Sequence, residues 1–364
     1  MPIKGGSFQQ PGAGQSPVQL RDRLSNCRLY FPSPNWSPAG GQAVKKVLRL
    51  LLWSFFVVVA LCGALFFYFI YSPRPKIPQL SGQVISGSIR QDNLQRTYLA
   101  YIPKGLPRGS PLVVVMHGSD GNGAQMRIAS GYGFERLADQ HHFAVAYPNG
   151  YEGYWNACNI VGDYAANERN LDDVGFLTAL VDKLVNDIGV DQRRVFATGI
   201  SRGGHMAFRL AIEAPSRFRA VAAIAANVPT PDNFKCRPAE SGTSSVMIMN
   251  GTRDPLNPFE GGEVKFFGMV RRGTVRSSRE SAQYFADLNK IITAPQRLES
   301  RASDGMSTEQ LLWRNDTNEV ELVAIQGGGH VIPQPYWRFP RLLGPTPKEP
   351  NGPALIWEFF EQQR

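Results

Sequence analysis

The segment Leu50–Tyr71 constrains the fold more than any other part of the 364-residue chain, because its 22 residues include no charged side chain. An α-helix rises about 1.5 Å per residue, so a helix of this length covers the roughly 30 Å hydrocarbon core of a bilayer. Trp53 lies near one end, and Tyr68 and Tyr71 lie near the other, where amphipathic rings favour the membrane interface. The sequence therefore predicts a transmembrane signal-anchor helix over residues 47–71, which meets the membrane through residues 50–71.

A cleaved signal peptide is the main alternative to an anchor. The apolar run is long for such a peptide, begins about 50 residues into the chain and has no A-x-A-like cleavage site after it. A lipoprotein signal at Cys62 is disfavoured by the bulky Leu61 before it. We expect the helix to remain as an uncleaved, single-pass anchor.

The charges on the two flanks of this segment predict its orientation. Lys45, Lys46 and Arg49 precede it, whereas Arg74 and Lys76 follow it. Cytoplasmic flanks carry the excess of basic residues. The N-terminus is therefore expected in the cytoplasm, and the larger C-terminal part is expected to be extracytoplasmic, either periplasmic or extracellular.

Composition divides the rest of the chain. Residues 1–46 are rich in Gly, Pro, Gln and Ser, have no hydrophobic period, and are predicted to be a disordered basic tail. Residues 72–84 include a Pro-rich stretch typical of a stiff linker. Residues 85–364 are predicted to form the folded domain, which has ample length for a core that shields a reactive site from water.

The net charge of +9 does not indicate a nucleic-acid partner. Residues 1–49 carry seven Lys or Arg against the single acid Asp22, which leaves +3 for the other 315 residues. Those residues contain no basic stripe with interleaved aromatics. The basic charge belongs to the tail, and we expect no binding to nucleic acid.

Strands alternate with helices from about Ser81 onward. Short apolar runs bounded by turns predict strands, and apolar residues at helical spacing predict helices between them. Such alternation predicts an α/β fold, with a mostly parallel sheet covered by helices on both faces and functional residues beyond the C-terminal ends of its strands. The expected strands cover 111–118, 143–150, 194–199, 220–228, 245–251 and 319–327, and the expected helices cover 126–140, 171–187, 203–214, 278–289 and 354–362.

The pentapeptide G-I-S-R-G at 199–203 lies between a predicted strand and a predicted helix. A nucleophile elbow requires a strand, a sharp strained turn and a helix, with small residues on both sides of the Ser. Ser201 is therefore the predicted nucleophile. The alternative, a strand-to-helix turn with a capping Ser, needs none of the partners described next.

A serine hydroxyl needs a base to remove its proton. His330 follows the last predicted strand in the Gly-rich segment QGGGH, where a loop could bring an imidazole to Ser201. His205 lies within the helix after the elbow and is expected to pack or cap locally. His141 and His142 are expected at the surface. His330 is the predicted base.

The acid that orients this imidazole should lie between Ser201 and His330 in the chain. Asp254 follows the strand 245–251 by three residues and is the predicted acid, and Glu260 is a possible substitute. Asp172 and Asp173 precede the Ser and are interpreted as residues of a helix start.

An oxyanion needs hydrogen-bond donors. One candidate is the backbone N–H of Arg202, directly after the nucleophile. The other is the N–H of Ser119 in the loop His117–Gly121, which His117 and Gly118 would shape.

With these residues in view, the chain resembles the extracellular polyhydroxybutyrate depolymerase and feruloyl esterase family of α/β-hydrolases. The similarity covers roughly residues 85–364 and implies an esterase triad of Ser201, Asp254 and His330. Arg202 departs from the family, which often has Asn there. The matching segments are VVVMHGSDG (113–121), AYPNG (146–150), DDVGFLTALVDKL (172–184), VDQRRVFATGISRGGHMAFRLA (190–211), NGTRDPLNP (250–258) and GGGH (327–330).

The expected function is hydrolysis of carboxylic esters through an acyl-enzyme, with a soluble ester or an oligomer as the substrate. A serine peptidase on the same fold and a non-catalytic binding protein are the alternatives. The Cys and His residues do not fall at metal-ligand spacings, and no dinucleotide fingerprint occurs, so no cofactor or metal is expected. Cys158 and Cys236 could form a disulfide or remain two buried thiols.

Overall fold

The computed structural model describes residues 38–363 except 92, 163, 241, 267–269 and 302–305. The predicted disordered tail lies outside the described residues up to position 37. The chain divides into one unit over residues 1–61 and a second over residues 62–364, and each is described by itself.

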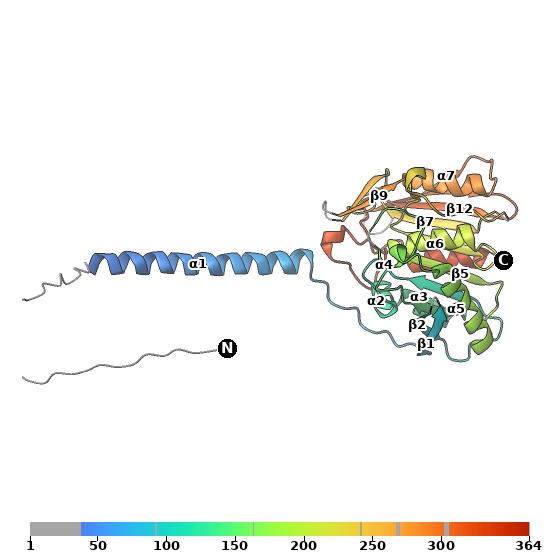
Figure 1. Ribbon diagram of the computed structural model, residues 1–364, viewed down its shortest axis with the longest axis horizontal. Helices are drawn as coiled ribbons and strands as arrows, with labels where there is room; N and C mark the ends of the chain where they lie inside the picture. The colour runs from blue at the N-terminus through green and yellow to red at the C-terminus, as the bar shows by residue number, and fades with distance from the viewer. Residues whose placement is uncertain are drawn as a thin grey trace, which may run out of the picture. The chain divides into compact units, whose positions relative to one another are not determined.

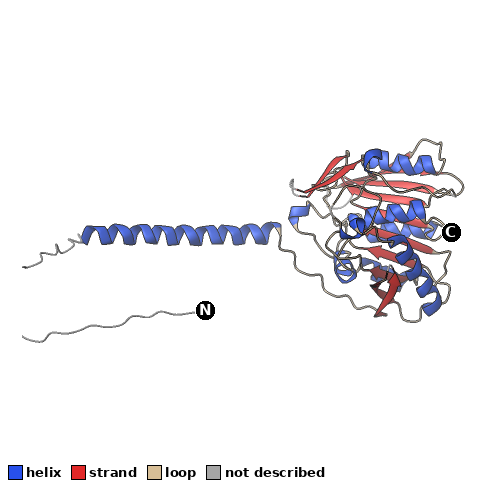
Figure 2. Ribbon diagram, in the orientation of Figure 1, coloured by secondary structure: helices blue, strands red, loops and turns tan. Residues whose placement is uncertain are grey.

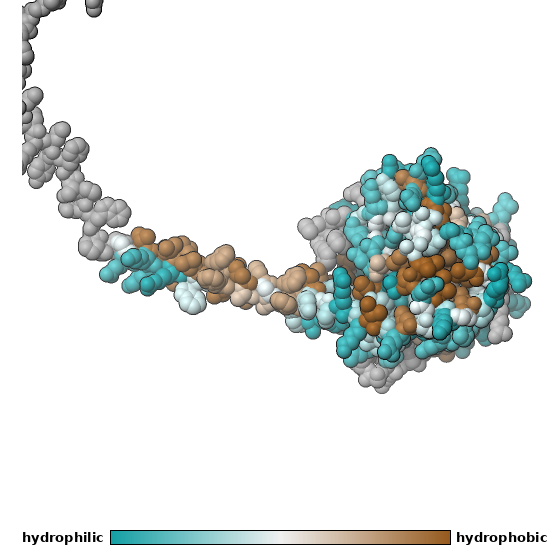
Figure 3. Space-filling model, turned by 90° about the horizontal axis from the view of Figure 1, so that it is seen from below, coloured by the Kyte–Doolittle hydropathy of each residue, from teal (hydrophilic) through white to brown (hydrophobic). Residues whose placement is uncertain are grey.

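The apolar segment forms helix α1 (Pro38–Phe69). Its part from Gly41 to Phe69 has the length and composition to cross a membrane, and none of it is buried. Figure 3 shows hydrophobic side chains along the helix and hydrophilic ones near its N-terminal end. The helix begins nine residues before the predicted start at 47, since a Pro is tolerated in the first turn. It ends shortly before Ser72-Pro73, where the Pro disfavours a helical residue ahead of it.

A ten-stranded sheet forms the centre of the second unit among the described residues (Figure 1). Strands β8 (Gly262–Phe266) and β9 (Val270–Val275) form a separate antiparallel hairpin. The spatial order in the large sheet is β1 (Gln83–Gln91), β2 (Leu94–Ile102), β4 (Ala144–Pro148), β3 (Leu112–Met116), β5 (Val195–Ile200), β6 (Ala220–Ile224), β7 (Ser245–Gly251), β12 (Glu319–Ile325), β11 (Ser307–Arg314) and β10 (Gln296–Arg301).

The central strands from β4 to β12 run parallel, and the strands at both edges are antiparallel. Every residue of β3 and β5 is buried, as expected for strands covered on both faces. Their continuous apolar runs are the reason that all six predicted strands are found. The outer strands β1, β2, β10 and β11 were not predicted, because they alternate buried with exposed polar residues or carry several charges.

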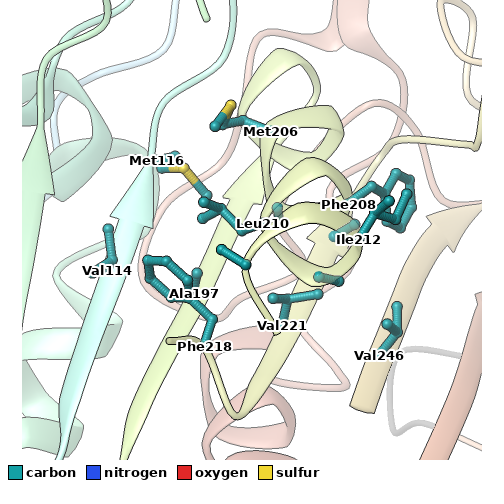
Figure 4. Packing of buried hydrophobic residues seen from close by; sticks show 14 of the residues in the cluster. Val114, Met116, Ala197, Met206, Phe208, Leu210, Ile212, Phe218, Val221 and Val246 are labelled. Atoms are coloured by element: carbon teal, nitrogen blue, oxygen red, sulfur yellow. The ribbon is translucent and has the colours of Figure 1, made fainter. Parts of the chain in front are cut away.

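Helices cover both faces of the sheet (Figure 2). One face packs against α5, α6 and α7, and the other packs against α2, α3 and α8. Figure 4 shows part of the first cluster, in which Met206 and Leu210 of α6 lie near Met116 and Ala197 of the sheet. Burying one such side chain stabilises the fold by about 1.5–3 kcal/mol. The helices after α1 are α2 (Gly123–Ala129), α3 (Gly133–His141), α4 (Ala165–Glu168), α5 (Asp173–Ile188), α6 (Arg202–Glu213), α7 (Ser278–Leu288) and α8 (Gly352–Gln362).

One predicted helix, 126–140, is two helices in the structure. Gly131 and Tyr132 separate α2 from α3, and both have a left-handed backbone with φ of 61° and 57°. At Gly131 the positive φ favours glycine, and a Cβ would also lie 2.0 Å from the side-chain oxygen of Gln334, which would have to move. The helical spacing of apolar residues continues through residues 130–132, so the sequence pattern did not indicate that the helix is interrupted there. The mostly parallel α/β-hydrolase architecture itself is confirmed.

Candidate active site

Ser201 occupies the turn between β5 and α6 with a strained backbone, φ 55° and ψ −118°. Its N–H donates to the carbonyl of Ile224 at 2.8 Å, which holds the turn against β6. A Cβ at Gly199 would lie 2.5 Å from the carbonyl carbon of Gly203. A Cβ at Gly203 would lie 2.4 Å from the carbonyl oxygen of Met116. The two glycines of the predicted elbow are thus required by close backbone packing.

Asp254 and His330 meet beyond the C-terminal ends of β7 and β12. Asp254 Oδ2 lies 2.8 Å from His330 Nδ1, and both residues are buried. The other carboxylate oxygen accepts the N–H groups of Leu256 and Asn257, each at 2.8 Å. These bonds fix the carboxylate so that it can hold one tautomer and one orientation of the imidazole.

The loops that carry Asp254 and His330 are bonded to each other. Arg253 N–H donates to the carbonyl of Gly328 at 2.9 Å, and Gly327 N–H donates to Thr252 Oγ1 at 2.9 Å. A Cβ at Gly251 would lie 2.3 Å from the Gly328 oxygen, so the glycines allow this close approach. The Asp–His separation is therefore set by backbone contacts.

The other titratable candidates have different surroundings. Glu260 is exposed, and the hydrogen bonds described for His330 include Asp254 but not Glu260. Burial lowers the pKa of His205 to about 3, which keeps that imidazole neutral. Asp173 pairs with Arg96 at 2.7 Å in the core, and its neighbour Asp172 caps α5 through the N–H of Gly175 at 2.8 Å.

The loop from His117 to Gly121 lies beside the elbow. Gly150 N–H donates to His117 Nε2 at 2.9 Å, so the proton is on Nδ1, which faces the Gly118 carbonyl at 2.7 Å. Burial lowers the pKa of His117 to about 4 and so maintains this neutral tautomer. A Cβ at Gly118 would lie 3.4 Å from Ser201 Cβ, and Ser119 follows directly. His117 and Gly118 thus shape this loop next to Ser201.

The side chain of Arg202 is buried and points away from solvent into the segment 155–167. Its Nε donates to the carbonyl of Trp155 at 2.7 Å, and its two terminal nitrogens donate to the side-chain oxygens of Asn159 and Asn167. Its guanidinium carbon lies 3.8 Å from the centre of the Tyr164 ring. The residue after the nucleophile therefore anchors a segment more than 30 residues upstream.

Cys158 of the same segment is joined to Cys236 by a disulfide, with the two Cα atoms 4.9 Å apart. Of the two alternatives that the sequence left open, the structure contains the disulfide. Asn233 adds a second connection, because its side-chain oxygen accepts the N–H groups of Ile160 and Val161 at 3.1 and 2.8 Å.

One cavity of about 320 Å³ contains the predicted site residues Ser119, Ser201, Arg202 and His330 in its lining. Asp254 lies behind His330. Within the described residues, no group of three or more His, Cys, Asp or Glu could hold a metal ion. The sequence did not identify the rest of the wall, since nothing in a loop sequence indicates that it folds over a distant elbow. These further lining residues include Met126, Tyr164, Leu256, Asn257, Lys265, Arg272, Phe339 and Leu343.

Comparison with known proteins places this arrangement in a family. Residues 96–254 match a family model described as esterase PHB depolymerase. NocK of Nocardia uniformis subsp. tsuyamanensis, a protein named as an esterase, is 32% identical over 77% of this chain and 83% of its own length. The chain belongs to the esterase PHB depolymerase family.

Other similar proteins are more distant. Feruloyl esterase C of Emericella nidulans is 30% identical over 46% of the chain, and the match spans 58% of that esterase. A solved acetyl xylan esterase from Aspergillus awamori is 17% identical, with a TM-score of 0.48, over 68% of this chain and 94% of its own. The family, NocK and the feruloyl esterase support a serine carboxylesterase, and the chain is a carboxylic ester hydrolase.

Proposed function

We propose that this esterase uses Ser201 as nucleophile, His330 as general base and Asp254 as the acid that orients the imidazole. The observation that carries the proposal is the 2.8 Å contact between Asp254 and His330, because His330 lines the same cavity as Ser201, whose backbone is strained. A triad is recognised by such geometry and by the roles of its members.

The reaction has two half-reactions. In the first, Ser201 Oγ attacks the ester carbonyl while His330 takes the hydroxyl proton, and the Asp254 carboxylate stabilises the imidazolium. The tetrahedral intermediate collapses, His330 gives the proton to the leaving alcohol, and an acyl-Ser201 remains. In the second, His330 takes a proton from water, which attacks the acyl group, and Ser201 leaves with that proton.

The oxyanion of each tetrahedral intermediate would be stabilised by the backbone N–H groups of Arg202 and Ser119. Arg202 N–H lies at the first residue of α6, where helix N–H groups and the helix dipole favour negative charge. The close approach of Gly118 to Ser201 supports Ser119 as the second donor. The buried Arg202 side chain would keep that N–H in position.

The substrate is proposed to be a carboxylic ester with a small or medium acyl group, as in a feruloyl, acetyl or hydroxyalkanoate ester. A cavity of about 320 Å³ is at the small end of ligand-binding pockets, which span about 300–1,000 Å³. Met126, Leu256, Phe339 and Leu343 provide apolar surface for an acyl chain.

The enzyme is proposed to be a single-pass membrane protein, with α1 as an uncleaved anchor and the catalytic domain from about residue 85 outside the cytoplasm. The excess of Lys45, Lys46 and Arg49 over the basic residues after the helix supports this orientation. The Cys158–Cys236 disulfide supports an oxidising compartment for the domain.

The test uses the full chain purified in detergent with 4-nitrophenyl esters from acetate to octanoate, methyl ferulate and hydroxybutyrate oligomers. The wild type should hydrolyse at least one ester, and folded Ser201→Ala should lose at least about 10³-fold in kcat. Equal activity in both proteins, or none in either with any ester, would refute the proposal.

A further inference from the structure

We propose that the cavity binds esters that carry a free carboxylate elsewhere in the molecule, and that Arg272 binds this carboxylate. This inference rests on the proposed function, since it assigns a substrate class to the same site. Three side chains that line the cavity carry the inference. Arg202 and Arg272 are cationic and form no ion pair with a described residue, and the amide of Asn257 has no hydrogen bond to one.

Arg272 lies on β9 and lines the cavity together with Ser201 and His330. Its Nη1 is enclosed by the protein and has no hydrogen-bond acceptor among the described residues. The ion pairs of the described part of the chain do not include Arg272 either. The residue as a whole is half-buried, but an enclosed guanidinium N–H without an acceptor is costly, and a substrate carboxylate would supply an acceptor and a counter-charge.

Arg202 adds a second positive charge at the same place. The guanidinium carbons of Arg202 and Arg272 lie 3.8 and 4.4 Å from the centre of one ring, Tyr164. All described hydrogen-bond partners of Arg202 are neutral: a carbonyl and two side-chain amides. The two charges therefore reinforce each other in a partly desolvated region, where an anion is attracted more strongly than in water.

The negative charges nearby have other partners. Asp120 also lines the cavity, but its carboxylate accepts a hydrogen bond from the hydroxyl of Tyr154 and is exposed to solvent. Glu263 pairs with Lys265 at 3.0 Å and with Arg271 at 3.1 Å. Asp254 faces His330. The buried carboxylate of Asp173 also acts on Arg202 but forms its ion pair with Arg96 at 2.7 Å. The ion pairs of the described residues therefore include neither Arg202 nor Arg272.

Asn257 gives independent support for a substrate with a second polar group. It is 2% exposed, it lines the same cavity, and neither atom of its side-chain amide has a hydrogen-bond partner among the described residues. Buried amides are almost always hydrogen-bonded. A purely apolar acyl chain would leave this amide unsatisfied, whereas a carboxylate or hydroxyl oxygen could bond to it.

The backbone that carries Arg272 is held in place. The next residue, Gly273, has a φ of 84°, and a Cβ there would lie 2.3 Å from Asn233 Nδ2. Asn233 also donates to the carbonyl of Thr274 at 3.1 Å and accepts from Ile160 and Val161. Strand β9 and the segment that carries Tyr164 are thus fixed to one another through Asn233.

The experiment compares matched esters that differ only in a distant carboxylate. With the carboxylate on the acyl group, the pairs are the mono-4-nitrophenyl esters of adipate, pimelate and suberate against 4-nitrophenyl hexanoate, heptanoate and octanoate, since shorter diacid esters cleave themselves through a cyclic anhydride. With the carboxylate on the alcohol, 3-carboxy-4-nitrophenyl butyrate is compared with 4-nitrophenyl butyrate. The wild-type full chain in detergent should favour at least one carboxylate ester by about tenfold or more in kcat/KM, mainly through a lower KM, and added salt should reduce this ratio.

Three variants test the assignment to Arg272. Arg272→Gln should lower the ratio to about one, and Arg272→Lys should retain part of it because the charge remains. Arg271→Gln is the matched control: this neighbour is 79% exposed and pairs with Glu263, and it should leave the ratio at the wild-type value. Thermal melts establish that each variant is folded.

The outcomes separate the two proposals. Hydrolysis of neutral esters with no preference for a carboxylate in either series would overturn this inference and leave the proposed function standing. A preference that survives in folded Arg272→Gln would overturn it as well. No hydrolysis of any ester by the wild type would refute the proposed function, and this inference with it.

Discussion

The reactive edge and the cavity wall of this enzyme are built in different ways. The reactive edge, defined as the proposed triad of Ser201, Asp254 and His330, comes from turns after the parallel strands β5, β7 and β12, of which β7 and β12 are neighbours. Backbone hydrogen bonds and glycine contacts hold it. The cavity wall, defined as the segment 155–167 and the hairpin β8–β9, lies outside the ten-stranded sheet and is held by side-chain hydrogen bonds, including those of Arg202, and by a disulfide.

This difference indicates that the reactive edge determines the reaction and that the cavity wall determines which esters are bound. The reactive edge follows from the sheet itself, so any member of the fold could build it. The cavity wall depends on side chains from segments far apart in the sequence, and they can change without changing the sheet. Changes at the edge should therefore affect kcat, and changes in the wall should affect stability, KM and selectivity.

The largest expected effect is at the reactive edge. Asp254→Asn keeps the shape of the side chain but cannot stabilise the imidazolium or hold the same tautomer, so kcat should fall about 10⁴-fold, as for the equivalent change in other triads. Glu260→Gln is the control and should remain within about twofold of the wild type. If Glu260→Gln lost this activity and Asp254→Asn kept it, Glu260 would be the residue that orients His330. Steady-state kinetics with one neutral ester provide the measurement.

The next prediction concerns Arg202, which holds the cavity wall, and its main effect should be on the stability of the fold. Arg202→Met removes three hydrogen bonds from a charged donor in the interior, to the Trp155 carbonyl and to the side-chain oxygens of Asn159 and Asn167, and leaves those two side-chain oxygens without a donor. We expect the free energy of unfolding to fall by about 3 kcal/mol, measured by chemical denaturation in detergent. Arg193→Met, at a side chain that is 85% exposed, should change it by less than about 0.5 kcal/mol. Equal stability of the two variants would mean that Arg202 does not anchor the segment.

The disulfide makes a comparable contribution to the same wall. Removing it with Cys158→Ala and Cys236→Ala together should lower the free energy of unfolding by about 2–4 kcal/mol, because the bond closes a loop with a sequence separation of 78. Cys62→Ala, at the exposed cysteine in α1, should leave the unfolding of the domain unchanged. If reduction of the wild type and the double variant both leave stability unchanged, the bond does not stabilise the wall.

The smallest expected effect concerns the pH dependence of stability. His117 is neutral in the folded protein with a pKa of about 4, against about 6.5 when unfolded, so the unfolded chain binds the extra proton between these values. Stability contributed by neutral His117 is present above about pH 6.5 and is lost as the pH falls toward 4, by about 1 kcal/mol per pH unit. His117→Asn should flatten the pH profile of the melting temperature in this window, whereas His142→Asn at the surface should not. An unchanged profile in His117→Asn would contradict the assignment.

The sequence predicted the reactive edge because the constraints on it are local. Ser201, with Gly199 and Gly203 around it, follows a mostly apolar strand, and Asp254 and His330 follow two other strands in the expected chain order. Continuous apolar strands are also the part of the sheet that the sequence predicted best. The early start of α1 at Pro38 and the break at Gly131 depend on local geometry that an apolar period does not encode.

The cavity wall was not predictable in the same way. Tyr164 and Arg272 are more than 100 residues apart and meet only because Asn233 and the disulfide fold their segments together. The buried side chain of Arg202 could not be inferred, since a charged residue at the start of a helix is usually solvent-exposed. Long-range side-chain contacts of this kind leave no period in the sequence.

The most direct test of the account is covalent labelling of the folded full chain with a fluorophosphonate, followed by mass spectrometry of its peptides. The account predicts one adduct, on Ser201, that forms together with loss of esterase activity and is absent from Ser201→Ala. An adduct on another serine in the active enzyme, or esterase activity that persists in Ser201→Ala, would contradict it.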